Sequence, residues 1–243
     1  MSNIMMGIDC YSKKGTAREY NRDFIGLFEF DTGVLAYLLD VSSSSSLDCI
    51  GFVELFNNLL SERIEPEIVA DYDLFLKALE QIIIDMQHSF KSGVASLIVS
   101  FIAYKSDNVW GYTVGDSRIG IMKDEIVWVS PVHTGANPFG ESFTDEMKLQ
   151  PERHILTRSL NMRKKYNPEF FQFKVTEDQS LVIASDGFWA ELAPELQLNL
   201  LAKQQVQSED DSSVITIKDF IYATKLNYSV SSENCSYVNL SNK

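Results

Sequence analysis

Residues 181–192, with the sequence LVIASDGFWAEL, constrain the fold of this chain more than any other stretch. The first four residues form a short apolar run with β-branched side chains, which predicts a buried strand. Ser185, Asp186 and Gly187 are turn residues that end the strand, and a helical pattern follows them. The Asp186 carboxylate is therefore expected at the end of a rigid strand, where a cation ligand can be held in place. Taken alone, these residues also fit an ordinary strand–turn–helix junction. A cation-binding role for Asp186 therefore requires further carboxylates at the ends of other strands.

A second group of carboxylates comes from a predicted hairpin. Residues 23–30 and 34–40 are largely apolar, and the turn residues between them predict two paired antiparallel strands. Folding the chain at this turn brings Asp23 opposite Asp40, with Cβ atoms about 5 Å apart, and like charges at that distance are destabilising. A divalent metal ion would supply the counter-charge, with help from Arg18. The alternative is a register slipped by one residue, which would move these side chains to other faces.

The hairpin strands carry apolar residues without clean alternation, which is typical of sheets covered on both faces and indicates a layered structure. Helical spacing of apolar residues predicts two helices, at 47–64 and 72–90, that form an antiparallel pair across one sheet.

Residues 130–167 are irregular, and loops of this length tend to be functional or mobile. Further strands are predicted at 4–11, 93–104, 109–115, 119–122, 126–129, 170–175, 180–184 and 235–240, and further helices at 195–205 and 216–226.

The formal net charge of −13 argues against a nucleic-acid partner or an anionic membrane surface, because both require a basic footprint. It suits a protein that collects cations, although solubility alone would also explain it. The N-terminal residues lack a basic region before a long apolar run, and no window approaches the length of a membrane span. We therefore expect a cytoplasmic protein, and we expect it to be a monomer.

The three cysteines, Cys10, Cys49 and Cys235, are widely spaced, and none belongs to a Cys-x-x-Cys motif. This pattern favours a reducing compartment and predicts neither a zinc site nor a disulfide. Each cysteine is expected to be a small core residue.

The chemistry-bearing residues flank predicted strands in a fixed order along the chain. The order is Arg18, Asn21 and Asp23, then Asp40, then Gly115-Asp116-Ser117-Arg118, then Ser185-Asp186-Gly187, then Glu233-Asn234. This ordered set resembles the metal-dependent serine/threonine phosphatases of the 2C type, the PPM family. The resemblance covers nearly the whole chain, from about Gly7 to Leu240, and 93–96 and 154–160 also look like family segments.

The resemblance implies an α+β fold, a four-layer αββα sandwich of two mainly antiparallel sheets flanked by helix pairs, as one domain over residues 1–243. It also implies two Mg²⁺ or Mn²⁺ ions in a cleft at one end of the sandwich, with a third, weaker site. By position, the metal-binding residues would be Asp23, Asp40 as the bridging ligand, the carbonyl group of Val41, Asp116 for the third ion, Asp186 and Glu233. Arg18 would clamp the substrate phosphate, so that Arg18 and Asp40 would be the catalytic pair.

The implied activity is hydrolysis of phosphoserine and phosphothreonine in proteins by a metal-activated water, with a cognate serine/threonine kinase as the opposing partner. Three residues depart from the family pattern. Arg22 stands where an acidic residue is usual, Val41 where glycine is usual, and Glu233 where aspartate is usual. These departures leave open a second hypothesis, a catalytically weak or inactive pseudophosphatase that acts as a regulatory binding module.

Overall fold

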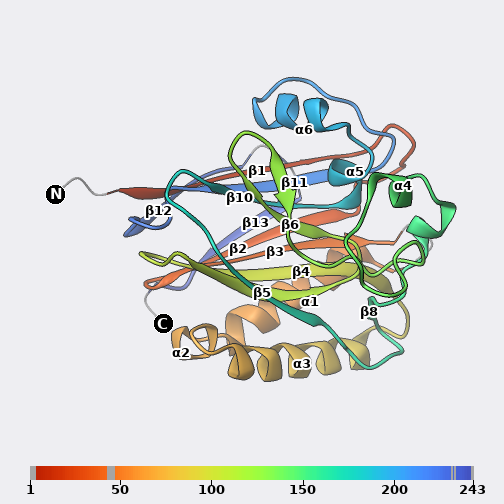
Figure 1. Ribbon diagram of the computed structural model, residues 1–243. Coiled ribbons are helices and arrows are strands. Elements are labelled where there is room, and N and C mark those ends of the chain that lie inside the picture. Colours follow the sequence, from red (N-terminus) through yellow and green to blue (C-terminus); the bar gives the residue numbers. More distant parts are fainter. Residues whose placement is uncertain (1–3, 43–46, 231, 233, 242–243) are drawn as a thin grey trace.

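Two β-sheets pack face to face in a computed structural model that describes residues 4–42, 47–230, 232 and 234–241 (Figure 1). The first sheet has the strand order β12-β1-β11-β10-β6-β7, and the second has the order β13-β2-β3-β4-β5-β9, with β8 paired to β4. The first sheet contains β1 (Met5–Lys13), β6 (Arg118–Met122), β7 (Ile126–Trp128), β10 (Ser180–Ala184), β11 (Ser212–Lys218) and β12 (Lys225–Val230). The second sheet contains β2 (Asp23–Phe30), β3 (Gly33–Val41), β4 (Val94–Ala103), β5 (Asn108–Val114), β8 (Leu160–Asn161), β9 (Glu169–Lys174) and β13 (Cys235–Asn239).

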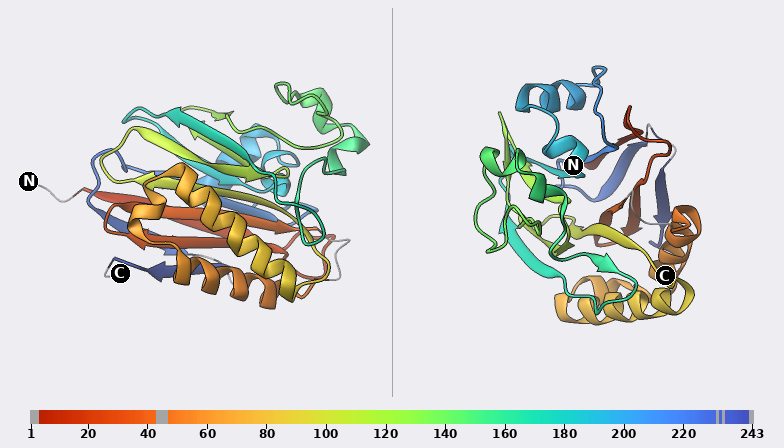
Figure 2. Two further views of the ribbon diagram at one scale, coloured as in Figure 1. Left: turned by 90° about the horizontal axis from the view of Figure 1, so that it is seen from below. Right: turned by 90° about the vertical axis from the view of Figure 1, so that its right-hand side faces the viewer.

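Helices lie on the outer faces of the sandwich, as the two views of Figure 2 show. Two long helices cover the second sheet, and each is preceded by an N-cap aspartate whose side chain accepts backbone hydrogen bonds from the first turn, Asp48 before α1 and Asp71 before α3. Among the described helices, none has the length and apolar character that a membrane-spanning helix requires. The helices are α1 (Cys49–Arg63), α2 (Pro66–Val69), α3 (Tyr72–Ser89), α4 (Asp145–Lys148), α5 (Asp186–Trp189) and α6 (Pro194–Leu201), with a 3₁₀ helix at Pro151–His154.

The second sheet is buried on both faces, which explains its apolar strands. In β2, Phe24 and Phe28 pack with the helices, whereas Ile25 and Leu27 pack between the sheets. This confirms the layered structure expected from the missing alternation. The four-layer αββα sandwich is confirmed as well, with α1 and α3 outside the second sheet and α6 outside the first (Figure 1).

One predicted element is wrong. Residues 216–226, expected to be a helix, form the end of β11, a turn and the start of β12. Four consecutive residues of β11, Val214-Ile215-Thr216-Ile217, are β-branched and lie in a buried position of the first sheet, where such side chains favour strand over helix. The outer layer over the first sheet therefore consists of α5 and α6, and α6 ends at Leu201, before the predicted end at residue 205.

We expect Phe56→Ala to lower the free energy of unfolding by about 3–5 kcal/mol, because it removes a fully buried ring from the contact between α1 and the second sheet. Phe56 is 0% exposed and lies edge-to-face with Tyr37, with ring centroids 5.2 Å apart. Urea unfolding measures the change. Ile50→Ala on the same helix is the matched control, because Ile50 is 66% exposed and its loss should change stability by less than about 0.5 kcal/mol. Equal effects of the two substitutions would contradict this packing.

Candidate metal centre

The hairpin of β2 and β3 places the first two carboxylates opposite each other. Its two-residue turn at Asp31 and Thr32 sets the register, and Asp23 pairs with Asp40. On its other side β3 pairs with β4, which brings Ser96 opposite Asp40. The predicted register is confirmed, and the slipped alternative is excluded.

Asp23 is a buried carboxylate with an incomplete set of partners. Its side chain is 1% exposed, and its Oδ2 atom has no hydrogen-bond partner among the described residues. Burial raises the pKa of Asp23 to about 7, although the nearby hydroxyl groups of Ser185 and Ser213 favour the charged form. A buried polar atom without a partner is costly, and a bound cation would supply one here.

Two further carboxylates come from the ends of other strands. Asp186 follows β10 and begins α5, while Asp116 follows β5 after Gly115. Gly115 has a φ of +105°, and a Cβ atom there would lie 2.2 Å from the Ser96 hydroxyl oxygen, so glycine is required. The Ser96 hydroxyl accepts a hydrogen bond from the Asp116 backbone N–H at 3.1 Å and donates one to the Asp116 carboxylate. Trp189 of α5 donates a hydrogen bond from Nε1 to the Asp116 carbonyl oxygen at 2.8 Å, which holds the backbone of Asp116 against α5.

The carboxylates act on one another electrostatically. Burial raises the pKa of Asp40 well above its usual range, and the charges of Asp23 and Asp186 raise it further. Burial also raises the pKa of Asp186, followed by the charge of Asp116. Arg153 opposes this effect, since its Nη1 atom donates to Asp186 Oδ2 at 3.1 Å. Four carboxylates predicted from the sequence therefore lie within electrostatic reach of one another, at one end of the sandwich.

A cavity of about 130 Å³ opens at this end of the sandwich. Strand ends and loops that are far apart in the sequence contribute acidic and basic side chains to its wall. The residues that line it are Arg18, Arg22, Asp40, Val41, Ser42, Ser96, Asp116, His154, Leu156, Asp186, Asp210 and Asp211. Asp23 is absent from this lining and is placed by its pairing with Asp40.

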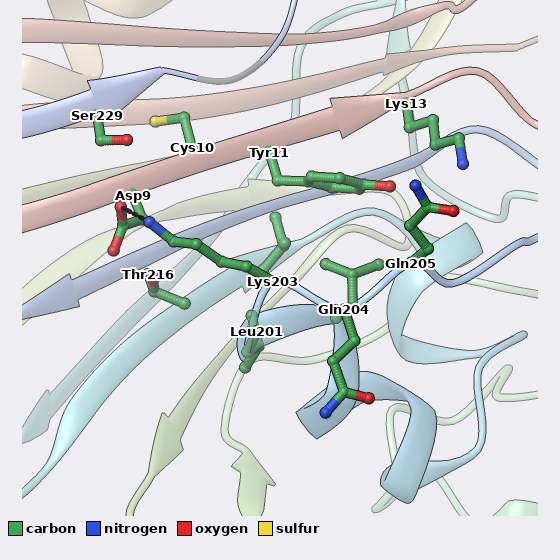
Figure 3. A pocket seen from close by; sticks show the side chains of 12 residues that line it. Asp9, Cys10, Tyr11, Lys13, Leu201, Lys203, Gln204, Gln205, Thr216 and Ser229 are labelled. Atoms are coloured by element: carbon green, nitrogen blue, oxygen red, sulfur yellow. Dashed lines mark hydrogen bonds and ion pairs between the residues drawn. The ribbon is translucent and has the colours of Figure 1, made fainter.

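A larger cavity of about 390 Å³ lies on the outer face of the first sheet (Figure 3). Asp9 is the sole carboxylate among the described residues that line it, and its Oδ1 atom lies 3.4 Å from Lys203 Nζ. This cavity therefore offers no group of acidic ligands for a hard cation.

Two carboxylates at the site, Asp210 and Asp211, were not predicted from the sequence. Asp211 accepts hydrogen bonds from the backbone N–H groups of Gly15 at 2.9 Å and Arg22 at 2.8 Å, which ties the loop before β2 to the loop before β11. Asp210 binds the Arg18 guanidinium through both carboxylate oxygens. The available signal was the acidic run at 209–211, immediately before β11, which is the same pattern of carboxylates flanking a strand.

The remaining predicted site residues occupy distinct positions. Arg18 lines the cavity, with its side chain 32% exposed and paired with Asp210. Val41 also lines the cavity, and its backbone N–H donates to the Arg22 carbonyl oxygen at 3.1 Å.

Glu233 lies outside the described residues. Its neighbour Asn234 is described, and the Asn234 side chain donates to the carbonyl oxygens of Asn21 and Asp23 at 3.0 and 2.9 Å.

Within the described part of the chain, no group of three or more acidic, histidine or cysteine side chains is already arranged as a metal-binding set. Like charges repel, and two of the carboxylates are paired with arginine, Asp210 with Arg18 and Asp186 with Arg153. The donor set nonetheless fits a hard divalent cation, because it consists of carboxylate oxygens and one of them is buried without a partner.

No protein-family model matches the sequence. A curated protein of Streptococcus pyogenes serotype M6, named "Putative protein phosphatase 2C-type", is 23% identical over 235 residues, which cover 87% of this chain and 91% of that protein. The solved structure of the Streptococcus agalactiae serine/threonine phosphatase matches with a TM-score of 0.71 and 21% identity, covering 88% of this chain and 99% of the other. The catalytic domain of the serine/threonine protein phosphatase PstP, solved in complex with two manganese ions, matches with a TM-score of 0.60 and 17% identity, covering 88% and 98%.

These matches span nearly the full length of each relative, and they establish that the chain has the PPM phosphatase fold. The resemblance to the 2C-type phosphatases that the sequence indicated is confirmed.

In the presence of a chelator, we expect Asp23→Asn to raise the melting temperature at pH 8 by at least about 2–4 °C, the shift that 1 kcal/mol produces in a chain of this length. The pKa of Asp23 is raised from 3.8 to about 7 in the folded state, so the folded state binds this proton more tightly than the unfolded state. The contribution of Asp23 to stability is therefore present below about pH 4 and is lost as the pH rises through about 7. Thermal unfolding from pH 5 to pH 8 measures the difference between variant and wild type.

The matched control is Asp124→Asn, which removes a carboxylate from an exposed turn and should leave the melting temperature nearly unchanged. A gain for Asp23→Asn that shrinks towards pH 8 would contradict the raised pKa.

Proposed function

We propose that this chain, a divergent relative of the 2C-type phosphatases, hydrolyses phosphoserine and phosphothreonine in proteins at a binuclear Mg²⁺ or Mn²⁺ site. The observation that carries the proposal is the convergence of Asp40, Asp116 and Asp186 on one cavity together with Arg18. Asp23 supports the same site from the paired strand, with a buried oxygen that lacks a partner. An acidic pocket with a guanidinium at its wall suits a phosphate monoester that is bound together with divalent cations.

The residues proposed to hold the two ions are Asp23, Asp40, the carbonyl group of Val41, Asp186 and Glu233, with Asp116 serving a weaker third site. Asp211 is added to the candidates because its carboxylate lines the same cavity. When bound, such ions lower the pKa of a coordinated water and offset the charge of the phosphoryl group. The protein's contribution is to hold the carboxylates on strand ends, where backbone pairing limits their movement.

Arg18 is proposed to bind the substrate phosphate. Its side chain is one-third exposed at the cavity, and its planar guanidinium already binds the two carboxylate oxygens of Asp210. A phosphate group presents oxygens in a similar arrangement, so it can exchange for Asp210 at the same donors. The proposed substrate is a phosphorylated protein, and its phosphorylation requires a serine/threonine kinase.

We expect Asp40→Asn and Asp186→Asn each to lower kcat/KM for p-nitrophenyl phosphate, assayed with Mn²⁺, by on the order of 100-fold or more. Each substitution removes a carboxylate at the centre of the site, and changes even beside metal ligands cost about 10–100-fold. Asp124→Asn serves again as the surface control and should leave turnover unchanged. Wild-type protein without Mn²⁺-dependent turnover and without Mn²⁺ binding by calorimetry would contradict the proposal and support the inactive binding module.

We expect Arg18→Ala to lower kcat/KM by about 10–100-fold while changing the Mn²⁺ dissociation constant less than about 3-fold. The guanidinium is proposed to contact phosphate, and charge-assisted hydrogen bonds of this kind contribute about 1.5–3 kcal/mol. Arg18→Lys keeps the charge and loses the planar fork, so it should recover part of the activity. Equal losses of turnover and of metal affinity in Arg18→Ala would contradict the phosphate-binding role.

A further inference from the structure

Cys10 and Cys235 come from opposite ends of the chain and meet in the space between the two sheets. Cys10 lies on β1, where alternate residues face inwards, and it is 2% exposed. Cys235 is the first residue of β13 and packs against the same inter-sheet core. Cys10 belongs to the inter-sheet cluster against which Cys235 packs, and the two thiols are close enough to act on each other electrostatically. The two thiols therefore form a contact that bridges the first and the second sheet.

A neighbouring contact between the edge strands β12 and β13 supports this pairing. The rings of Tyr228 on β12 and Tyr237 on β13 are stacked, with centroids 4.1 Å apart and planes inclined by 21°. Tyr228 lies beside Ile8 in the first sheet, and Cys10 is the next residue of β1 on the same face. Cys235 is likewise the next residue to Tyr237 on its face of β13. Each cysteine therefore lies two residues along its strand from the position of the tyrosine stack, on the same face of the strand.

Cys235 is also the accessible member of the pair. Its side chain is partly exposed, and the Ser232 hydroxyl oxygen lies 2.9 Å from its sulfur. Cys49 differs, since it lies at the start of α1 with its thiol directed at the Leu47 carbonyl oxygen at 3.5 Å. The chain therefore contains its own control cysteine, which is partly exposed but packs against the helices rather than against the other two.

We propose that Cys10 and Cys235 form a reversible disulfide in response to hydrogen peroxide. In the first step the Cys235 sulfur attacks one peroxide oxygen, an S–O bond forms, the O–O bond breaks, and the departing hydroxide takes up the thiol proton as water. In the second step the Cys10 sulfur attacks the Cys235 sulfenic acid, the S–S bond forms, the S–O bond breaks, and the Cys10 proton leaves with the hydroxide as a second water. Peroxide is reduced, the two thiols are oxidised, and a dithiol such as dithiothreitol reverses the change. In a reducing compartment both residues remain the core thiols that the sequence predicts.

The disulfide would act on the proposed metal centre through Asn234, and this part of the proposal rests on the proposed function. Asn234 precedes Cys235, and its side-chain amide donates hydrogen bonds to the carbonyl oxygens of Asn21 and Asp23. An S–S bond of about 2.05 Å is shorter than any hydrogen-bonded thiol contact, so its formation draws the start of β13 towards β1. That movement pulls on the backbone of Asp23, and we expect the oxidised protein to bind Mn²⁺ more weakly.

The test treats the full-length protein with equimolar hydrogen peroxide, alkylates the remaining thiols and maps the peptides by mass spectrometry. We expect a Cys10–Cys235 crosslink, one remaining alkylatable thiol at Cys49, and three thiols after dithiothreitol. Cys49→Ser should form the same crosslink, whereas Cys10→Ala and Cys235→Ser should not. Oxidation of Cys235 to a sulfinic acid without a crosslink in the wild type, or a crosslink that involves Cys49, would overturn the assignment.

Calorimetry with Mn²⁺ on the reduced and oxidised wild type tests the coupling separately. We expect the Mn²⁺ dissociation constant to rise by a factor of about 3 or more on oxidation and to return with dithiothreitol, as a coupling of this size corresponds to about 0.7 kcal/mol. A crosslink with unchanged Mn²⁺ affinity would overturn the coupling. Failure of the reduced protein to bind Mn²⁺ would overturn the proposed function and leave the crosslink result intact.

Discussion

The concentration of negative charge at one end of the sandwich is the constraint on which this structure depends. Asp23 and Asp40 are paired across a hairpin, and the charges of Asp116 and Asp186 both raise the pKa of Asp40. Burial is the largest cause of the raised pKa at each of these carboxyl groups, because it removes the water that would solvate the charge. The fold holds the groups in place at this cost, which is typical of sites built for binding and not for stability.

The rest of the molecule offsets this cost. Apolar side chains fill the space between the sheets and the contact of α1 and α3 with the second sheet. Two arginines supply partial compensation, since Arg153 contacts Asp186 and Arg18 contacts Asp210. A guanidinium is a weaker substitute than a divalent ion, because it carries one charge and contacts the carboxylates from one side. The proposed metal ions would supply positive charge to the carboxylates that these two arginines do not contact.

Local signals were sufficient to predict the parts of the site that depend on one hairpin or one strand end. The short turn after β2 determines that Asp23 faces Asp40, and the apolar run of β10 leads directly to Asp186.

Residues 216–226 were predicted wrongly because their apolar spacing fits both a helix and a strand. The position of β11 between β1 and β10, in the middle of the first sheet, decides in favour of a strand. Because of this error, Asp210 and Asp211 were predicted to lie in a loop between two helices and were not recognised as carboxylates at the end of a strand. Contacts such as Arg153 with Asp186, and Cys10 with Cys235, join distant segments and leave no pattern in the local sequence.

The most direct test of this account is an anomalous difference map at the manganese absorption edge from crystals grown or soaked with Mn²⁺. We predict manganese peaks in the cavity lined by Asp40 and Asp186, within coordination distance of these carboxylates and of Asp23. A map from fully soaked crystals without manganese at these carboxylates, or with manganese bound only elsewhere on the surface, would contradict it.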